Sequence, residues 1–372
     1  MNVLVVDVHD PQCLKIIRSL SKDPTIRSFV LGSKKRAPVA RSRYCNGYFS
    51  LQGVSGGEPW FERVREVAKE CEADLLMAVT EDTLRNLLHY RERFAQSGFK
   101  VMEMGSEESF ERSTDKWLFY ERLARAGIPQ PLTIALEDAM TADDFWAAVS
   151  SSGAVLKRRQ GCGGADAQFI RHLEELQPYL ESLEKDRWIL QEYVEGVDIA
   201  VNFVSKSGNF IAWFVQEALS TLGQFGYQMH MRISTEHTEA VAMAQRVVDA
   251  LEWEGPGCVD FRVDKRTNQL LCFENNPRFG RAVLIGTVAG VNLPLAAAGR
   301  PVPDVEAQVA EFQHLSNLYR SPTQLFRPWA QNGIKRRTIL PEILRDPIPE
   351  MAQSFTRFVS QLSPRGRNAA RG

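Results

Sequence analysis

The chain has 372 residues, which is enough for two or three domains with a large hydrophobic core and excludes a small disulfide-stapled protein. Hydrophobic residues make up 44% and charged residues 24%, the proportions of an ordinary globular protein rather than a disordered or fibrous one. The 45 Lys and Arg nearly balance 46 Asp and Glu, so the net charge of −1 gives no reason to expect nucleic-acid or anionic-membrane binding.

The six cysteines are scattered along the chain, and none forms a C-x-x-C pair or a Cys/His pair at the spacing of zinc ligands. We therefore expect reduced thiols. The N-terminus leads directly into an apolar strand pattern without signal-peptide features, and no segment approaches 18 uninterrupted apolar residues. The sequence predicts a cytoplasmic protein without a transmembrane helix.

Short apolar runs alternate with amphipathic segments over the first hundred residues. The expected strands are 3–6, 29–31, 74–79 and 100–104, and the expected helices are 13–21, 60–71 and 81–96. This alternation indicates a parallel sheet with helices on its faces, a Rossmann-like domain over residues 1–105. No G-x-G-x-x-G follows the first strand, so the fingerprint of a nicotinamide-binding domain is missing.

Polar clusters follow two strands of this sheet, at the edge where α/β proteins bind ligands. One cluster comprises residues 7–10, and the other comprises Thr80, Glu81 and Asp82. Helix capping alone accounts for Thr80 and Asp82, because Thr and Asp favour the first helical turn. Contact with a substrate is the other interpretation, and the sequence leaves both open.

The middle of the chain mixes strand and helix patterns. The expected helices are 116–126, 142–150 and 236–251, and the expected strands are 154–157, 188–193, 199–205, 210–216, 258–263 and 270–274. Residues 113–115 suit an N-cap, and the helix that follows them stops at Gly127. The last two strands form an expected hairpin, in which Asn268 suits the positive φ of the turn.

The segment from Pro301 onwards is less regular and contains eight prolines. Its ten Lys and Arg against six Asp and Glu give a local charge of +4. A charge of this size is more typical of solvated surface than of a nucleic-acid arm, and 363–372 is expected to be a disordered basic tail. The segment could cover a substrate pocket, form a homodimer contact or do neither.

Asp260, Glu274 and Asn276 are the strongest candidates for a chemical site. If the predicted hairpin pairs, its two carboxylates and the amide oxygen lie close together, and these are the hard ligands that Mg²⁺ prefers beside nucleotide phosphates. Bare carboxylates at this distance would repel each other, which favours a cation. The alternative is that both acids are separate surface residues, but their apolar neighbours in the sequence fit that poorly.

Two further strings suit nucleotide binding. Lys157 ends a predicted strand and is followed by the glycine-rich residues 161–164, whose backbone N–H groups could approach phosphate oxygens. Residues 191–198 form a strand edge that could meet an adenine, followed by a carboxylate that could reach a ribose. Each string alone also fits an ordinary strand and turn.

Taken in order, these motifs resemble the ATP-grasp superfamily, most closely its carbamoyl-phosphate-synthetase-like branch. The matching strings are Asp115-Lys116, 127–131, 155–157 with the glycine loop, 191–198, and 274–281 (ENNPRFGR). The resemblance covers about residues 106–300. It implies an α/β protein, with α+β organisation in the grasp region, in three parts. These are the N-terminal domain 1–105, a two-lobed ATP-grasp domain with lobes of about 106–190 and 191–300, and a C-terminal extension 301–372.

Carried over position by position, the resemblance implies a set of nucleotide-binding residues. They are Lys116, Lys157, Gly161, Gly163, Gly164, Glu192, Val194 and Asp198. The lysines would contact the phosphates, the glycines would close over them as a flexible lid, and the last three would meet the adenine edge and the ribose. Cys162 stands where the family often has a serine, which changes little because the lid uses backbone donors.

The same resemblance implies the metal ligands and the catalytic groups. Asp260, Glu274 and Asn276 would hold one or two Mg²⁺ ions, for which Mn²⁺ could substitute. Arg278 would stabilise the transferred phosphoryl group and the acyl-phosphate, Arg281 would orient the substrate carboxylate, and Lys157 would take part in catalysis through the phosphates.

The remaining side chains favour phosphoryl transfer over other chemistry. No Ser-His-Asp arrangement is visible, and the six histidines form no metal-ligand pair. His230 lies in an alternating pattern that suggests a packed or exposed strand residue, although Arg232 nearby could face a substrate. Lysines, arginines, metal ligands and a glycine loop are groups that place phosphates and neutralise developing charge.

The leading hypothesis is an ATP- and Mg²⁺-dependent ligase that joins a small-molecule carboxylate to an amine, amino acids among them, through an acyl-phosphate. No nucleic-acid or membrane partner is expected. A bicarbonate-activating enzyme of the same fold is a second possibility, but the chain lacks the second half that carbamoyl-phosphate synthesis would suggest. The third is a regulatory module that binds nucleotide without catalysis.

Overall fold

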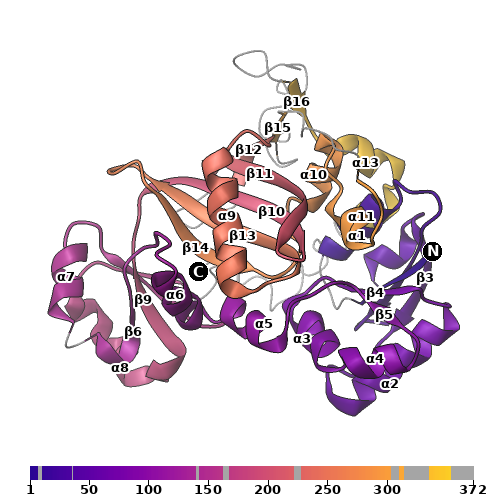
Figure 1. Cartoon of the computed structure of the whole chain (residues 1–372), viewed down its shortest axis with the longest axis horizontal. Helices are drawn as coiled ribbons and strands as arrows, with labels where there is room; N and C mark the ends of the chain where they lie inside the picture. The colour runs from indigo at the N-terminus through magenta and orange to yellow at the C-terminus, as the bar shows by residue number, and fades with distance from the viewer. Residues whose placement is uncertain are drawn as a thin grey trace, which may run out of the picture.

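The structure is a computed structural model that describes residues 1–6, 11–35, 37–139, 142–161, 167–221, 228–302, 310–313 and 335–352. Three sheets organise these residues (Figure 1). A five-stranded sheet belongs to the N-terminal part and a four-stranded sheet to a small lobe, and a seven-stranded sheet lies between them. The expected α/β organisation is confirmed.

The N-terminal sheet has the strand order β3-β2-β1-β4-β5, and every pair in it is parallel. Its elements are β1 (Asn2–Val6), α1 (Pro11–Leu20), β2 (Arg27–Gly32), β3 (Cys45–Ser50), α2 (Gly57–Glu70), β4 (Leu75–Ala78), α3 (Glu81–His89), α4 (Arg91–Gln96) and β5 (Lys100–Val101). The side chains of Val3–Val6 are fully buried, as expected for the central strand of a parallel sheet covered on both faces. The parallel sheet was predicted, but the expected helix 81–96 is divided in two at Tyr90.

The small lobe contains a four-stranded antiparallel sheet in the order β6-β9-β7-β8. The chain reaches it through α5 (Glu107–Thr114) and α6 (Lys116–Arg125), and the lobe itself contains β6 (Thr133–Ala135), α7 (Asp143–Val149), β7 (Ala154–Arg158), β8 (Gln168–Ile170), α8 (Gln177–Ser182) and β9 (Trp188–Glu192). Its core, which includes Phe145, Leu156 and Trp188, is separate from the main core of the chain. The small lobe therefore has a hydrophobic core of its own.

The seven-stranded sheet has the order β14-β13-β10-β11-β12-β15-β16. Its elements are β10 (Gly196–Lys206), β11 (Asn209–Thr221), β12 (Gln228–Ser234), α9 (Thr238–Leu251), β13 (Gly255–Asp264), β14 (Leu270–Asn276), β15 (Ala310–Gln313) and β16 (Lys335–Arg337). Helix α9 packs against β10, β11 and β13. The predicted β13–β14 hairpin forms, and Asn268 in its turn has a φ of 59°.

Three short helices join the sheet to the N-terminal part. α10 (Val283–Ala289) and α11 (Leu293–Ala297) both pack against α1. After β16, α13 (Leu340–Arg345) lies beside the N-terminal part, where Arg18 and Asp346 form an ion pair at 3.2 Å with side-chain exposures of 1% and 2%. The segment after residue 300 therefore contributes strands to the central sheet and a helix to the N-terminal part. The predicted tail 363–372 lies outside the described residues.

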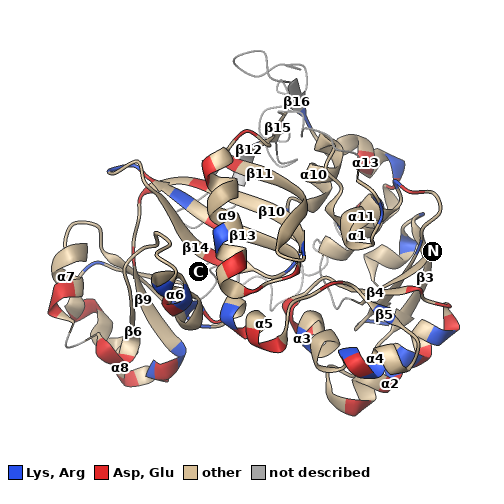
Figure 2. Ribbon diagram, in the orientation of Figure 1, with Lys and Arg blue, Asp and Glu red and all other residues tan. Residues whose placement is uncertain are grey.

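Charged side chains of both signs share the surface helices. Figure 2 shows them interspersed on α2 and α4, where Arg93 pairs with Glu58 at 2.6 Å. Of the cysteines, the five within the described ranges are free thiols, as predicted. Within those same ranges, no helix is long and apolar enough to cross a membrane.

Candidate active site

The β13–β14 hairpin brings the predicted metal ligands together. In its register Asp260 lies opposite Glu274, and Cys258 lies opposite Asn276. Asn276 Nδ2 donates to Asp260 Oδ2 at 3.0 Å and to Glu274 Oε1 at 3.1 Å. Because cross-strand partners and alternate residues share one face of a sheet, all three polar side chains project from the same face.

Charge is concentrated in this carboxylate pair. Burial, with the neighbouring charge of Glu274, raises the pKa of Asp260 well above its ordinary value. Burial also opposes ionisation of Glu274, but Lys116, Asn276 and Lys157 outweigh it and lower the pKa of that carboxyl. The pair thus tends to hold one proton, on Asp260. A divalent cation at the carboxylates would compensate their negative charge in place of this proton.

The donor set fits a hard cation held by two carboxylates. No group of three or more Asp, Glu, His and Cys side chains suited to a metal occurs in the described part of the chain, so these two acids would need help from the amide, the phosphates or water. Asn276 presents its nitrogen to the carboxylates, while its Oδ1 accepts from Arg278 at 3.0 Å. The amide would have to turn before its oxygen could become a ligand.

Lys157 projects from the end of β7 toward the carboxylates. Its Nζ donates to Gln191 Oε1 at 2.7 Å and lies 5.4 Å from the centre of the Phe273 ring. Burial lowers the pKa of Lys157 to about 8, with Glu274 opposing and Lys116 adding to that effect. Lys157 therefore loses its proton at a lower pH than an exposed lysine does, and a bound anion would raise its pKa again.

Lys116 is the first residue of α6, where Asp115 forms the N-cap by accepting from two backbone N–H groups. Its Nζ donates to the carbonyl of Gly161 at 2.7 Å and lies 4.0 Å from Glu274 Oε2. The ammonium thus links the start of the predicted glycine lid to the carboxylate pair. Gly163 and Gly164 lie outside the described residues.

The three residues expected to meet adenine and ribose lie around the β9–β10 connection. Glu192 pairs with Arg266 at 3.1 Å, and the side chain of Val194 is buried. Arg262 donates to the Val194 carbonyl at 2.8 Å and to Asp198 Oδ1 at 2.6 Å. The guanidinium of Arg262, which the sequence did not single out, therefore contacts two of the three predicted nucleoside-binding residues, Val194 and Asp198.

Arg262 and Phe273 are the residues of this region that the sequence did not single out. The guanidinium of Arg262 lies 5.2 Å from the centre of the Phe273 ring, which also faces Lys157. A signal for Arg262 was present, since it lies two residues after Asp260 on a strand and must share its face. Phe273 had no such signal, because an aromatic residue before an acid in a strand is most often core.

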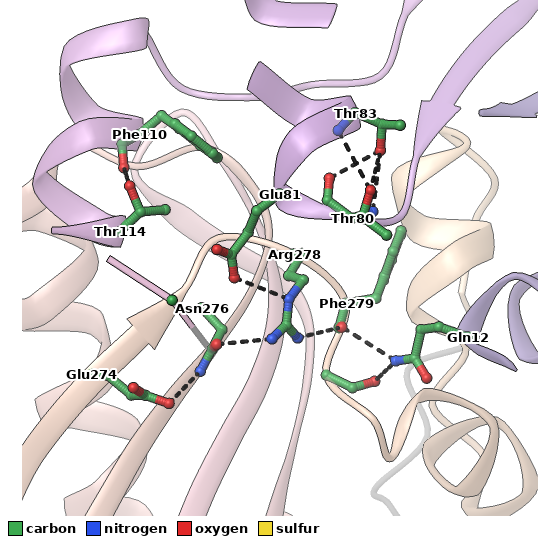
Figure 3. A network of polar contacts seen from close by, with 12 residues as sticks. Gln12, Thr80, Glu81, Thr83, Phe110, Thr114, Glu274, Asn276, Arg278 and Phe279 are labelled. Atoms are coloured by element: carbon green, nitrogen blue, oxygen red, sulfur yellow. Dashed lines mark hydrogen bonds and ion pairs between the residues drawn. The ribbon is translucent and has the colours of Figure 1, made fainter. Parts of the chain in front are cut away.

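Arg278 connects the carboxylate pair to the N-terminal part. Its Nε donates to Glu81 Oε1 at 3.2 Å, Nη2 donates to Asn276 Oδ1 and Nη1 donates to the Phe279 carbonyl (Figure 3). Side chains of α1 hold the backbone around it, since Gln12 donates to the carbonyls of Phe279 and Gly280. Figure 3 shows these contacts as one chain from Gln12 to Glu274.

Other predicted residues lie at the margin of this cluster. Arg281 is exposed, and its carbonyl accepts from Lys15 at 2.7 Å. Thr80 caps α3 in a reciprocal capping box with Thr83, so the capping interpretation holds for this residue. Glu81, which the sequence left open, contacts Arg278.

Arg232 does not lie on the same face as the carboxylates. It pairs with Glu217 at 3.2 Å and with Glu311 at 3.5 Å. The cross-strand row of Asp260 continues through Ala200, Gln216 and Ile233, so Arg232 belongs to the neighbouring row on the opposite face. The alternative that Arg232 faces a substrate at this site is not supported, and the side chain of His230 lies outside the description.

Comparison with known proteins identifies the domain that contains this cluster. Residues 113–281 match the family model of the ATP-grasp domain. Among solved structures, a biotin carboxylase of Campylobacter jejuni is 17% identical with a TM-score of 0.64 over 82% of this chain and 73% of its own. An ADP complex of N5-carboxyaminoimidazole synthetase from Staphylococcus aureus is 14% identical with a TM-score of 0.68 over 89% and 91%.

An L-amino acid ligase of Bacillus licheniformis is 15% identical with a TM-score of 0.61 over 82% of this chain and 75% of its own. At such identities these likenesses concern the fold. The search among curated proteins gave no match. Together the family match and the shared fold confirm the resemblance found in the sequence, and residues 113–281 are an ATP-grasp domain.

Proposed function

We propose that this chain, an ATP-dependent ligase built on an ATP-grasp domain, joins a carboxylate to an amine through an acyl-phosphate intermediate. The substrate carboxylate attacks the γ-phosphate and releases ADP, and the amine then attacks the activated carbonyl and releases phosphate. The observation that carries the proposal is the convergence of Lys116, Lys157 and Arg278 around the half-buried pair Asp260 and Glu274. Cations on one side and carboxylates on the other suit a reaction that moves a phosphoryl group.

The two lysines would bind the phosphates and bring the γ-phosphate toward the substrate. Lys157 would hold its proton more firmly once an anion lies beside it, because its pKa of about 8 reflects burial without that anion. Lys116 would leave the Gly161 carbonyl to do so, and Gly161, Gly163 and Gly164 would then close over the nucleotide. A closed loop would exclude water, which would otherwise hydrolyse the acyl-phosphate.

Asp260 and Glu274 would hold one or two Mg²⁺ ions, with Asn276 as a third ligand after its amide turns. When bound, the metal would neutralise phosphate charge and replace the proton shared by the carboxylates. Arg278 would stabilise the transferred group, and its bonds to Asn276 and Phe279 hold the guanidinium in place for this role. Arg281 would orient the carboxylate from the exposed end of the same loop.

The nucleotide base and sugar would meet the β9–β10 connection. Glu192 and Val194 would contact the adenine edge through backbone atoms, and Asp198 would accept from a ribose hydroxyl. Arg262 supports this placement because it already holds the Val194 carbonyl and the Asp198 carboxylate in position. We also propose domain boundaries at residues 105 and 300. Strands β15 and β16, which follow the second boundary, extend the seven-stranded sheet of the domain 106–300.

The test is ADP release from Mg²⁺ and ATP in the presence of panels of acids and amines. With the substrate carboxylate labelled with ¹⁸O, one label should appear in inorganic phosphate, because that oxygen attacks phosphorus. Label in AMP instead would indicate adenylation and contradict the proposed mechanism. A nucleotide-binding regulatory module would bind ATP yet release no ADP with any pair.

Bicarbonate is the second candidate for the activated acid. It is favoured by two of the structural neighbours, whose names describe a biotin carboxylase and a carboxyaminoimidazole synthetase. ADP release that requires bicarbonate, and that other acids do not support, would select this candidate. Transfer of one ¹⁸O label from bicarbonate to inorganic phosphate would show that the reaction with bicarbonate also proceeds through a phosphorylated intermediate.

A further inference from the structure

Glu81 has a contact that helix formation does not require. It is the first residue of α3, but the helix is capped by Thr80 and Thr83, whose side chains and backbone N–H groups satisfy each other. The adjacent Asp82 supplies a second negative charge in the first turn and is exposed. Neither capping nor the helix dipole therefore explains why Glu81 points to another domain.

The partner of Glu81 is the arginine of the proposed reaction centre. Glu81 Oε1 lies 3.2 Å from Arg278 Nε, and the two side chains are 25% and 17% exposed. Within the described ranges, Glu81 makes no other polar contact through its side chain. The N-terminal part thus places one carboxylate directly against the guanidinium (Figure 3). Because both side chains are partly exposed, solvent or a ligand can still reach them.

We propose that Glu81 and Arg278 together recognise the zwitterion of an α-amino acid, which supplies the carboxylate for the proposed reaction. Arg278 binds the carboxylate and Glu81 binds the α-ammonium group. The inference rests on the proposed function, in which Arg278 stabilises the phosphoryl group as it passes to the substrate carboxylate, so that this carboxylate must come to lie beside Arg278. Glu81 is then a specificity-determining residue that selects amino acids over simple carboxylic acids.

The chemistry of the pair supports this substrate class. An α-amino acid carries opposite charges on neighbouring atoms of one carbon, and Glu81 and Arg278 present the complementary charges in contact with each other. An arginine alone would accept any carboxylate, whereas an adjacent carboxylate repels a simple anion and attracts an ammonium group. The discrimination comes from an attractive and a repulsive contact together.

The experiment compares acids that differ only in the amino group. ATP-dependent hydroxamate formation is measured with hydroxylamine as the nucleophile, so the natural amine need not be known. The matched pairs are L-alanine with propionate, L-leucine with 4-methylpentanoate, and L-phenylalanine with 3-phenylpropionate. The quantity of interest is the ratio of kcat/KM for the amino acid to kcat/KM for its partner.

The wild-type protein should prefer the amino acid in the pair that it uses. Glu81→Gln should lower this ratio about 10- to 100-fold, because it removes a charge-assisted contact and a repulsion while kcat/KM for the simple acid stays the same or rises. Glu81→Asp should keep the preference, since it keeps the charge. Asp82→Asn is the matched control, because it removes the same charge from the same helical turn without touching Arg278, and its ratio should equal that of wild type.

Two results would overturn the inference. If Glu81→Gln lowers kcat/KM for both acids of a pair by the same factor, Glu81 only positions Arg278. If wild type prefers the acids without an amino group, the proposed recognition of α-amino acids by Glu81 and Arg278 is wrong. Absence of hydroxamate from wild type with every acid, bicarbonate included, would instead count against the proposed ligase function.

Discussion

Arg262 of β13 and Asp198 of β10 are cross-strand partners, and the guanidinium donates to the carboxylate at 2.6 Å. The same guanidinium donates to the carbonyl of Val194. One arginine thus orders two of the three residues that we expect to meet the nucleoside, through contacts within the protein itself. A nucleotide would then find acceptors that are already oriented, which reduces the entropy lost on binding.

Asp198→Ala should weaken ATP binding about tenfold, because a ribose hydroxyl loses a charged acceptor. The loss should be smaller for 2′,3′-dideoxy-ATP, which has no hydroxyl to offer. Isothermal titration of both nucleotides measures the two dissociation constants. Glu195→Gln is the control, since this exposed side chain pairs only at the surface with Lys265. Equal losses for both nucleotides would contradict the ribose contact.

Glu274→Gln and Arg278→Ala should each lower the rate of ADP release at least about 100-fold, because each removes a group that faces developing charge. Circular dichroism should show the wild-type spectrum for both variants. Lys265→Ala, which changes an exposed residue on the β13–β14 turn, should leave the rate unchanged. Activity near that of wild type in either site variant would refute the assignment of that residue.

Mg²⁺ without nucleotide should raise the melting temperature by a few degrees, because a ligand bound only to the folded state stabilises it. The shift should disappear in Asp260→Asn, which leaves a single carboxylate in the pair. Differential scanning fluorimetry with NaCl at equal ionic strength separates binding from screening. A shift of the same size in the variant would mean that the metal binds elsewhere.

ATP affinity should fall as the pH rises from 7 to 10. Burial holds the pKa of Lys157 near 8 in the free protein, and bound phosphates favour its charged form and raise that pKa. Binding therefore takes up a proton above pH 8, and the affinity should fall by up to roughly tenfold per pH unit there. Lys157→Arg, which keeps its charge at these pH values, should show a flatter profile when titrated with ATP. Identical profiles would exclude Lys157 as the titrating group.

Asp346→Ala should lower the free energy of unfolding by about 3 kcal/mol, because it leaves a buried guanidinium at Arg18 without its carboxylate. Chemical denaturation measures the change. The double variant Arg18→Met with Asp346→Leu should recover most of the loss, since apolar side chains fill the site without a charge. A single variant as stable as wild type would show that Glu350, which also pairs with Arg18, suffices.

Local pattern was enough to predict the central hairpin and its acids. Alternation along β13 and β14, together with Asn268 in the turn, predicted that the two acids lie on neighbouring strands of a hairpin. A shift in the pairing between Asp260 and Phe261, which the sequence did not predict, then brings Asp260 directly opposite Glu274. Lys157 was found because it ends a short buried strand before glycines. In these cases the interacting groups lie within one or two elements, so their spacing in the sequence carries the information.

Contacts between distant segments had no such signal. Glu81 and Arg278 are 197 positions apart, and neither neighbourhood shows that the start of a helix in the N-terminal part meets the loop after β14. Strand β3 was not expected, because Cys45–Ser50 is polar and only partly buried at the edge of its sheet. Strands β15 and β16 have four and three residues and are recognisable only beside the sheet that they extend.

The buried pair of Arg18 and Asp346 also sets an order of events during synthesis. Its members are 328 residues apart, so at about 5–20 residues per second the carboxylate leaves the ribosome on the order of tens of seconds after the arginine. Throughout that interval the nascent N-terminal sheet carries an uncompensated charge on the inner side of α1. The N-terminal sheet, which is made before the other two sheets, thus gains its last buried ion-pair partner only after α13 has been made.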